Sequence, residues 1–320
     1  MKKVLIYILC VVLMTASLMG CAQKDGTLSA GAEDRISIVS TIFPPYDFAR
    51  AVAGDKADVN LLVDPGTEVH SYDPSPADIV MIQDADIFIY IGGENDAWVN
   101  TVLSSMDLSD MTIIRMMDVV KPVEEEAVAG MQQEENEDVS AEEEREYDEH
   151  IWTSPKNAVL MVKAIQDALC AIDADNAQAY EENATAYTAE IEELDTQLKQ
   201  IVNNASSHTL VVGDRFPFRY MAEEYGLEYR AAFLGCSAQT EVSANTLAYL
   251  IDYVQDNNIE YVYYIEFSNK NIASSICEQT GAQMLLLHSC HNVTSEEFET
   301  GVTYISLMKN NAENLKKGLG

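Results

Sequence analysis

The stretch that decides the fold runs from Ala177 to Ile201 and reads AQAYEENATAYTAEIEELDTQLKQI. Its apolar residues recur at alternating steps of three and four, which places them in one narrow seam along an α-helix. The seam consists of Ala177, Tyr180, Ala184, Tyr187, Ile191, Leu194, Leu198 and Ile201. A helix of about 28 residues would be a rod of about 42 Å, long enough to cross a small domain and reach its neighbour. A coiled-coil dimerisation helix is the alternative.

Short β-branched runs alternate with helical patterns on both sides of this helix, which is typical of parallel sheets. Before it we expect strands at 36–41, 57–63, 86–91 and 112–117, with helices at 45–54, 76–84, 97–106 and 155–170. After it we expect strands at 209–213, 228–233, 260–266 and 283–287, with helices at 216–225, 242–256, 270–279 and 295–317. The predicted fold is therefore α/β, with two doubly wound parallel-sheet lobes (35–172 and 206–320) bridged by one long rigid helix (173–205).

The first twenty residues have the pattern of a signal peptide: Lys2 and Lys3 precede a short apolar run, and Leu18-Met19-Gly20 stands directly before Cys21. This ending resembles the bacterial lipobox, in which the cysteine is lipidated. A plain secretory signal is the alternative. We expect residues 1–20 to be removed and residues 21–34 to form a lipidated tether. The protein would then be extracytoplasmic and anchored to the cell membrane through Cys21.

The chain is strongly acidic, with 19 Lys and Arg against 53 Asp and Glu and a net charge of −34 over 320 residues. Such a polyanion repels phosphate backbones, which makes nucleic acid a poor partner and favours cations. Residues 122–149 hold thirteen of the carboxylates and one Arg. We expect this segment to be a mobile, solvated loop that raises the local concentration of cations.

Four cysteines remain after Cys10 and Cys21 are set aside, and an extracytoplasmic location would allow them to pair. Cys236 and Cys290 fall in polar loops after strands and are the preferred pair if one forms. Cys170 and Cys277 fall in predicted helices and are expected to be buried thiols.

Four of the five histidines follow predicted strands, where open parallel sheets bind their ligands. His70 and His150 belong to the first lobe, and His288 and His291 follow the last strand. His208 precedes a strand and lies at the wrong end. Imidazoles from both lobes facing one crevice indicate a metal site, and nitrogen-rich ligands suit Zn²⁺, whereas more oxygen ligands would favour Mn²⁺.

The sequence motifs around these histidines resemble those of the zinc- and manganese-binding solute-binding lipoproteins of bacterial metal ABC importers, the ZnuA-like family. The resemblance lies in Val63-x-Pro65-Gly66-Thr67-Glu68-x-His70-x-Tyr72-x-Pro74-Ser75-Pro76, in Ala85-Asp86-x-Phe88-x-Tyr90, and in Asp148-x-His150-x-Trp152-x-x-Pro155-x-Asn157-Ala158. It covers essentially the whole mature chain. It implies two α/β lobes joined by one long helix, with the metal buried between them.

By this resemblance His70 and His150 are metal ligands of the first lobe, and His291 aligns approximately with the fourth ligand of the family. The chain departs from the family at the third ligand, which falls on Arg215. A guanidinium stays protonated and cannot bind a metal ion, so Arg215 needs a carboxylate partner. Glu241 and Glu266 are the candidates, and we expect Arg215 to pair with Glu241. His288 is expected to be a fourth ligand or to support the others.

The predicted function is that of a binding protein, not an enzyme: it captures one divalent cation, Zn²⁺ or alternatively Mn²⁺, and presents it to the membrane permease of an ABC importer. We expect a monomer. The alternatives are a surface adhesin lipoprotein and a secreted zinc hydrolase. The surroundings of the metal discriminate between receptor and enzyme, because a closed site with little solvent indicates a receptor and a substrate-sized pocket indicates an enzyme.

Overall fold

The computed structural model describes residues 35–132, 146–237, 239 and 241–320, and Ile36–Gly320 forms one compact unit. The predictions for the signal peptide, for Cys21 and for the tether lie outside the described residues. Among the helices that are described, none combines the length and the apolar character needed to cross a membrane.

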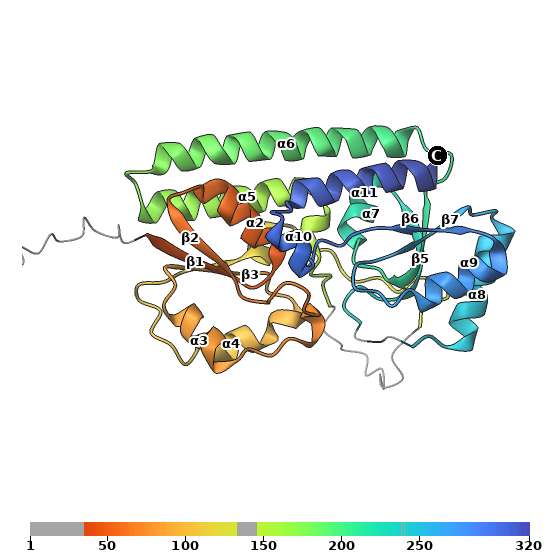
Figure 1. Ribbon diagram of the computed structural model, residues 1–320, viewed down its shortest axis with the longest axis horizontal. Helices are drawn as coiled ribbons and strands as arrows, with labels where there is room; N and C mark the ends of the chain where they lie inside the picture. The colour runs from red at the N-terminus through yellow and green to blue at the C-terminus, as the bar shows by residue number, and fades with distance from the viewer. Residues whose placement is uncertain (1–34, 133–145, 238, 240) are drawn as a thin grey trace, which may run out of the picture. The chain divides into compact units, whose positions relative to one another are not determined.

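Two four-stranded parallel sheets form the centres of two lobes (Figure 1). The N-terminal lobe contains β1 (Ile36–Ser40), β2 (Ala57–Leu61), β3 (Ile87–Tyr90) and β4 (Thr112–Arg115), in the order β2-β1-β3-β4. The C-terminal lobe contains β5 (Thr209–Arg215), β6 (Glu228–Phe233), β7 (Tyr261–Tyr264) and β8 (Gln283–Leu286), in the equivalent order β6-β5-β7-β8. Every pair of neighbouring strands is parallel, which confirms the predicted fold class.

Helices cover both faces of each sheet (Figure 1). In the N-terminal lobe they are α2 (Phe43–Ala53), α3 (Pro76–Gln83), α4 (Ala97–Leu103) and α5 (Pro155–Ile172). The C-terminal lobe has α7 (Arg219–Tyr225), α8 (Ala244–Asp256), α9 (Asn271–Thr280), α10 (Ser295–Glu299) and α11 (Tyr304–Leu319). The single helix predicted at 295–317 is wrong, because Gly301 adopts a left-handed φ of 76° and Thr303 caps a new helix.

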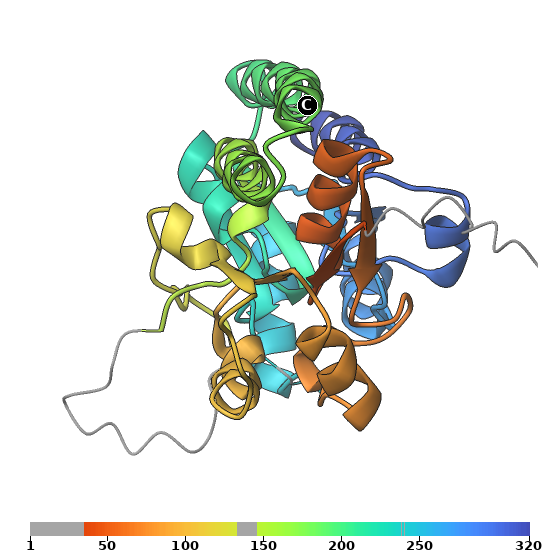
Figure 2. The same ribbon diagram turned by 90° about the vertical axis from the view of Figure 1, so that its left-hand side faces the viewer.

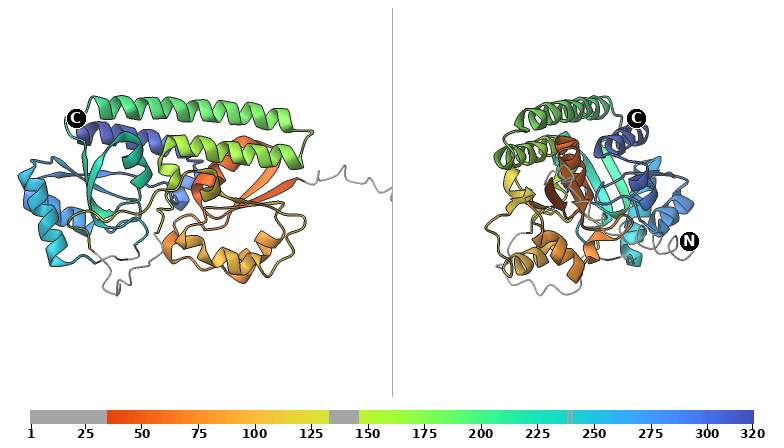
Figure 3. Two further views of the ribbon diagram at one scale, coloured as in Figure 1. Left: turned by 180° about the vertical axis from the view of Figure 1, so that it is seen from behind. Right: turned by 60° about the vertical axis from the view of Figure 1, so that its left-hand side comes forward.

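The long helix α6 (Ala177–Asn203) runs along both lobes, as Figures 1 and 3 show. Its 27 residues give a rod of about 40 Å. Its seam packs against α2 and α5 of the N-terminal lobe and against α11 of the C-terminal lobe. Seam residues of α6, including Tyr180, Leu194 and Leu198, are buried by other parts of the same chain. The coiled-coil alternative is therefore wrong.

The largest hydrophobic core is continuous from one lobe to the other. It includes Ile38 of the first sheet, Trp152 between the lobes, Leu194 of α6 and Val212 of the second sheet. In the end-on view, α5, α6 and α11 form a layer on one side of the sheets, and α3 and α4 lie on the opposite side of the first (Figure 2). A wide separation of the lobes would expose part of this core, which disfavours large hinge motions.

The start of the acidic segment is a strap (residues 123–132) that lies on the C-terminal lobe. The amide of Val123 donates to the hydroxyl of Tyr220 (3.1 Å), and the amide of Gln132 donates to the carbonyl of Ala232 (2.9 Å), on the edge strand β6. The side chain of Met131 is buried. The prediction of a mobile loop is wrong for this part, because its few apolar residues and its backbone amides find partners on the second lobe. Residues 133–145 lie outside the described residues.

Candidate metal centre

His70 lies in a short 3₁₀ helix, η2 (Val69–Ser71), in the loop that follows β2. A carboxylate oxygen of Glu68 accepts a hydrogen bond from the main-chain amide of His70 (3.3 Å) and lies 2.8 Å from its ring Nδ1. Gly66 adopts a left-handed φ of 86°, and its amide donates to the carbonyl of Val293 in the other lobe (2.7 Å). The loop is therefore held from both lobes, and the Ser75 cap of α3 fixes its exit.

His150 closes the acidic segment and precedes η5 (Ile151–Thr153), and its side chain is fully buried. One oxygen of Asp148 accepts a hydrogen bond from the amide of His150 (2.8 Å) and lies 3.2 Å from its Nδ1. Ser154 caps α5, which begins at Pro155 as predicted. The spacing Asp148-x-His150 thus orients the imidazole so that Nε2 points away from the carboxylate.

His291 belongs to the loop after β8 in the C-terminal lobe. Its amide donates to the hydroxyl of Ser289 (3.1 Å), and the carboxylate of Glu266 accepts hydrogen bonds from both the amide and the hydroxyl of Ser289. The indole of Trp152 donates across the lobes to the carbonyl of Ser289 (2.7 Å), and its ring centre lies 4.9 Å from that of His291. Glu266 and Trp152 therefore position this loop.

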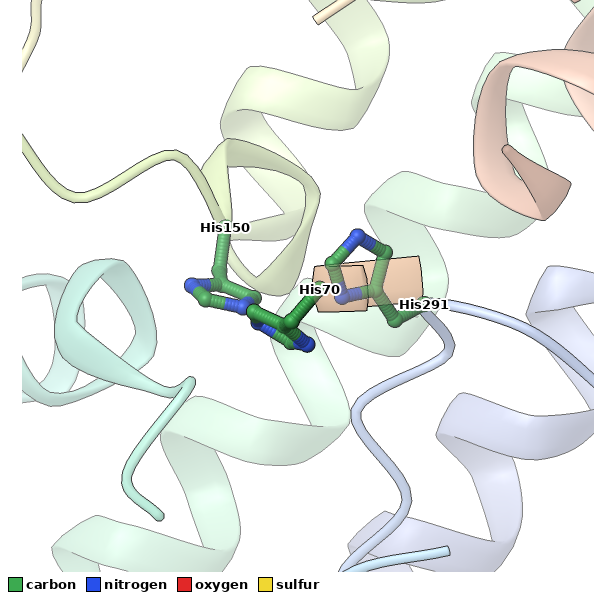
Figure 4. A group of neighbouring side chains, drawn as sticks. All are labelled: His70, His150 and His291. Atoms are coloured by element: carbon green, nitrogen blue, oxygen red, sulfur yellow. The ribbon is translucent and has the colours of Figure 1, made fainter. Parts of the chain in front are cut away.

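The three imidazoles meet between the lobes (Figure 4). One ligand atom from each of His70, His150 and His291 lies within 4.8 Å of the other two. The Nε2 atoms of His70 and His150 are buried and have no hydrogen-bond partner among the described residues. The cavity that these three residues help to line has a volume of about 20 Å³, which accommodates about one water molecule or a bare ion and no organic substrate.

The surroundings set the protonation of the three imidazoles. Burial lowers the pKa of His70, assisted by the charge of Arg215 and opposed by the hydrogen bond to Glu68. Burial, together with the neighbouring His70 and His150, lowers the pKa of His291 well below its usual range. Burial also disfavours the charged form of His150, but Asp148, Glu149 and Glu125 together outweigh this effect and raise its pKa. Two of the three rings are thus held in the neutral form that binds metals.

The other two histidines are not part of this cluster. His288 lies outside the group of three: its Nδ1 accepts a hydrogen bond from the amide of Cys290 (2.9 Å), which ties the ring to its own turn. His208 is exposed just before β5, at the wrong end of the sheet, as predicted.

The prediction that Arg215 pairs with Glu241 is wrong. The guanidinium of Arg215 reaches Glu68 of the opposite lobe (2.9 Å), while Glu241 is exposed on the surface. Glu68 and Asp148 were not predicted as partners of the histidines. The spacing of a carboxylate two residues before both His70 and His150 was the available signal, since it allows one side chain to reach both the amide and the ring.

All four cysteines of the described chain are free thiols, so the Cys236–Cys290 pair does not form. Cys290 is fully buried, and its Sγ lies 3.7 Å from the carbonyl of His288. The amide of Cys236 donates to Glu125 (3.1 Å), in the strap. Cys170 and Cys277 are partly buried and lie in α5 and α9, the helices that were predicted for them.

The chain is similar to proteins of bacterial zinc uptake. It is 33% identical to the zinc-binding lipoprotein AdcA of Streptococcus pneumoniae over 288 residues, which are 89% of this chain and 56% of AdcA, so it spans about half the length of that relative. It is 30% identical to the high-affinity zinc uptake system protein ZnuA of Bacillus subtilis over 310 residues, which are 96% of this chain and 94% of that protein.

The same similarity is seen among solved structures. The crystal structure of the Zn(II)-bound ZnuA-like domain of Streptococcus pneumoniae AdcA matches with a TM-score of 0.74 and 32% identity, covering 89% of this chain and 99% of that domain. The family model described as zinc-uptake complex component A, periplasmic (ZnuA), matches residues 38–318. The chain belongs to this ZnuA family.

Proposed function

We propose that this protein captures one divalent metal ion between its lobes with His70, His150 and His291 and delivers it to the membrane permease of an ABC importer. The observation that carries the proposal is the meeting of three buried imidazoles from two lobes around a cavity of about 20 Å³. The family is one of zinc-uptake components and not of enzymes, in agreement with the sequence-based prediction.

Zn²⁺ is the proposed cargo. Three nitrogen ligands suit zinc, whereas Mn²⁺ prefers a shell richer in oxygen. The carboxylate nearest to the imidazoles, Glu68, is engaged by Arg215. In this proposal the chain is a variant of the family in which Arg215 stands at the position of a metal ligand. His291 then provides the third imidazole that binds the metal.

The small cavity argues against the zinc hydrolase, because a hydrolase needs room for a substrate beside the metal-bound water. Glu149, the carboxylate next to His150 that could act as a base, instead accepts a hydrogen bond from the amide of Asn95 (3.2 Å).

We place the proposed function outside the cytoplasm, with residues 1–20 as a signal peptide, Cys21 as a lipid anchor and residues 21–34 as the tether of a monomeric body. Members of its family and relatives carry the descriptions periplasmic and lipoprotein, which supports this location. Mass spectrometry of the membrane fraction would test it, since a diacylglyceryl group on Cys21 is the expected modification.

Metal binding is tested on the mature protein after it is stripped with a chelator. Zinc binding to the folded state alone raises stability by RT ln(1 + [L]/Kd), about 2.7 kcal/mol at a hundredfold excess over Kd. We expect one zinc ion per chain and a larger thermal shift with Zn²⁺ than with Mn²⁺ or Fe²⁺. No shift with any of these ions would contradict the proposal.

A further inference from the structure

Arg215 ends β5 of the C-terminal lobe and lies at the site without being able to bind a metal ion. One of its terminal nitrogens donates to a carboxylate oxygen of Glu68 (2.9 Å). The other donates to the carbonyl of Ser237 (3.2 Å) and lies 3.0 Å from Nδ1 of His70. The side chain of Arg215 is only 14% exposed. A single guanidinium therefore joins the loop of His70 to the opposite lobe.

Glu68 connects Arg215 to His70 through its two oxygens. One oxygen receives the hydrogen bond from Arg215, and the other lies 2.8 Å from Nδ1 of His70. The position of one proton decides what this arrangement does. If Nδ1 carries the proton, it donates to Glu68 and leaves Nε2 free for a metal ion; if Nδ1 is bare, it accepts from Arg215 and the buried Nε2 carries a proton that has no acceptor.

We infer that Arg215 is a positioning residue of the zinc site: it holds Glu68, and Glu68 fixes the ring of His70 with Nε2 presented to the metal before the metal arrives. The inference rests on the proposed function of the three histidines. A carboxylate that accepts from the second nitrogen of a metal-binding imidazole fixes its tautomer and orientation. Arg215 adds one more residue to this series of hydrogen bonds and belongs to the opposite lobe.

The charges around Arg215 distinguish a positioning role from one in which Arg215 only repels the metal ion. An isolated guanidinium beside three imidazoles would repel a dication, and its removal would then strengthen metal binding. In this site the negative charge of Glu68 lies against the guanidinium and compensates for it. Removal of Arg215 should therefore weaken zinc binding. The planar fork also matters, because a lysine offers a single point charge that cannot hold Glu68 and Ser237 with the same geometry.

The test compares Arg215→Ala, Arg215→Lys, Glu68→Gln and the double variant Arg215→Ala/Glu68→Gln with the wild type in competition titrations of Zn²⁺ against a chromophoric chelator. We expect each single change to lower the affinity about 10- to 100-fold. We expect the double variant to match Glu68→Gln within about threefold, because Arg215 acts through Glu68. Arg219→Ala is the matched control, since Arg219 is similarly buried (16% exposed) but pairs with Glu126 and Glu223.

A ¹⁵N NMR measurement of the metal-free protein reports which ring nitrogen of His70 carries the proton, and a general loss of stability would not change this. The ring of His70 should carry its proton on Nδ1 in the wild type and lose this preference in Arg215→Ala and Glu68→Gln. Unchanged or tighter zinc binding in Arg215→Ala would overturn the inference, and so would a proton on Nε2 in the wild type. Failure of the wild type to bind zinc would instead count against the proposed function.

Discussion

Replacing Asp148 by asparagine isolates the contribution of the carboxylate behind His150. The carboxylate is 1% exposed and contacts both the amide (2.8 Å) and the ring Nδ1 (3.2 Å) of His150. Asparagine keeps an oxygen for the amide, so the turn should persist, but it removes the charge that stabilises the proton on Nδ1. Loss of such a partner typically costs 10- to 100-fold in metal affinity, which corresponds to about 1.4–2.7 kcal/mol of binding free energy.

The assay for Asp148→Asn is a competition titration of Zn²⁺ on chelator-stripped protein, with urea unfolding of the metal-free protein to check the fold. Asp173→Asn is the control, because the carboxylate of Asp173 lies where α5 meets α6 and binds Asn176 and Tyr180. Unchanged zinc affinity in a folded Asp148→Asn protein would mean that Asp148 does not orient His150 for metal binding.

Three further outcomes follow from the structure. His291→Ala should abolish tight zinc binding, whereas His208→Ala should leave it unchanged in the same titration, and equal affinities would contradict the assignment of His291. Gly130→Ala should destabilise the protein by about 1–3 kcal/mol in urea unfolding, because its φ is +86° and its Cβ would lie 1.9 Å from an atom of a packed tyrosine ring; Gly226→Ala has a positive φ but open space and should cost less. Burial raises the pKa of Asp96 to about 6, so between its unfolded and folded pKa values this carboxyl is protonated in the folded state and ionised in the unfolded state. The unfolding free energy should therefore fall by up to about 3 kcal/mol from pH 4 to pH 7, and Asp96→Asn should remove this pH dependence. An unchanged pH profile in Asp96→Asn would contradict this.

The fold was predictable where local patterns and tertiary structure agree. β-Branched runs between helical segments predicted the strands of both sheets, and the seam of α6 predicted a long helix that one chain buries. The break near Gly301 was missed because apolar residues continue on both sides of it. The docking of the strap was missed because composition reports only the average polarity of a segment. The strap is held by individual groups, such as the buried side chain of Met131 and the amide of Gln132.

The site was predictable in its histidines and less so in the groups that hold them. Strand ends placed His70, His150 and His291 in loops at one edge, and the structure brings them together. The pairing of Arg215 depends on which carboxylate of the other lobe faces it, and this is set by the relative placement of the lobes. Sequence spacing carries no information on that placement, so Glu241 was chosen and Glu68 was missed.

A crystal structure of the protein with zinc, phased at the zinc absorption edge, would test the proposed metal site. We expect one anomalous peak between the lobes, about 2.0–2.1 Å from a ring nitrogen of each of His70, His150 and His291. A zinc ion bound by carboxylates elsewhere, with the three imidazoles left unoccupied, would contradict it.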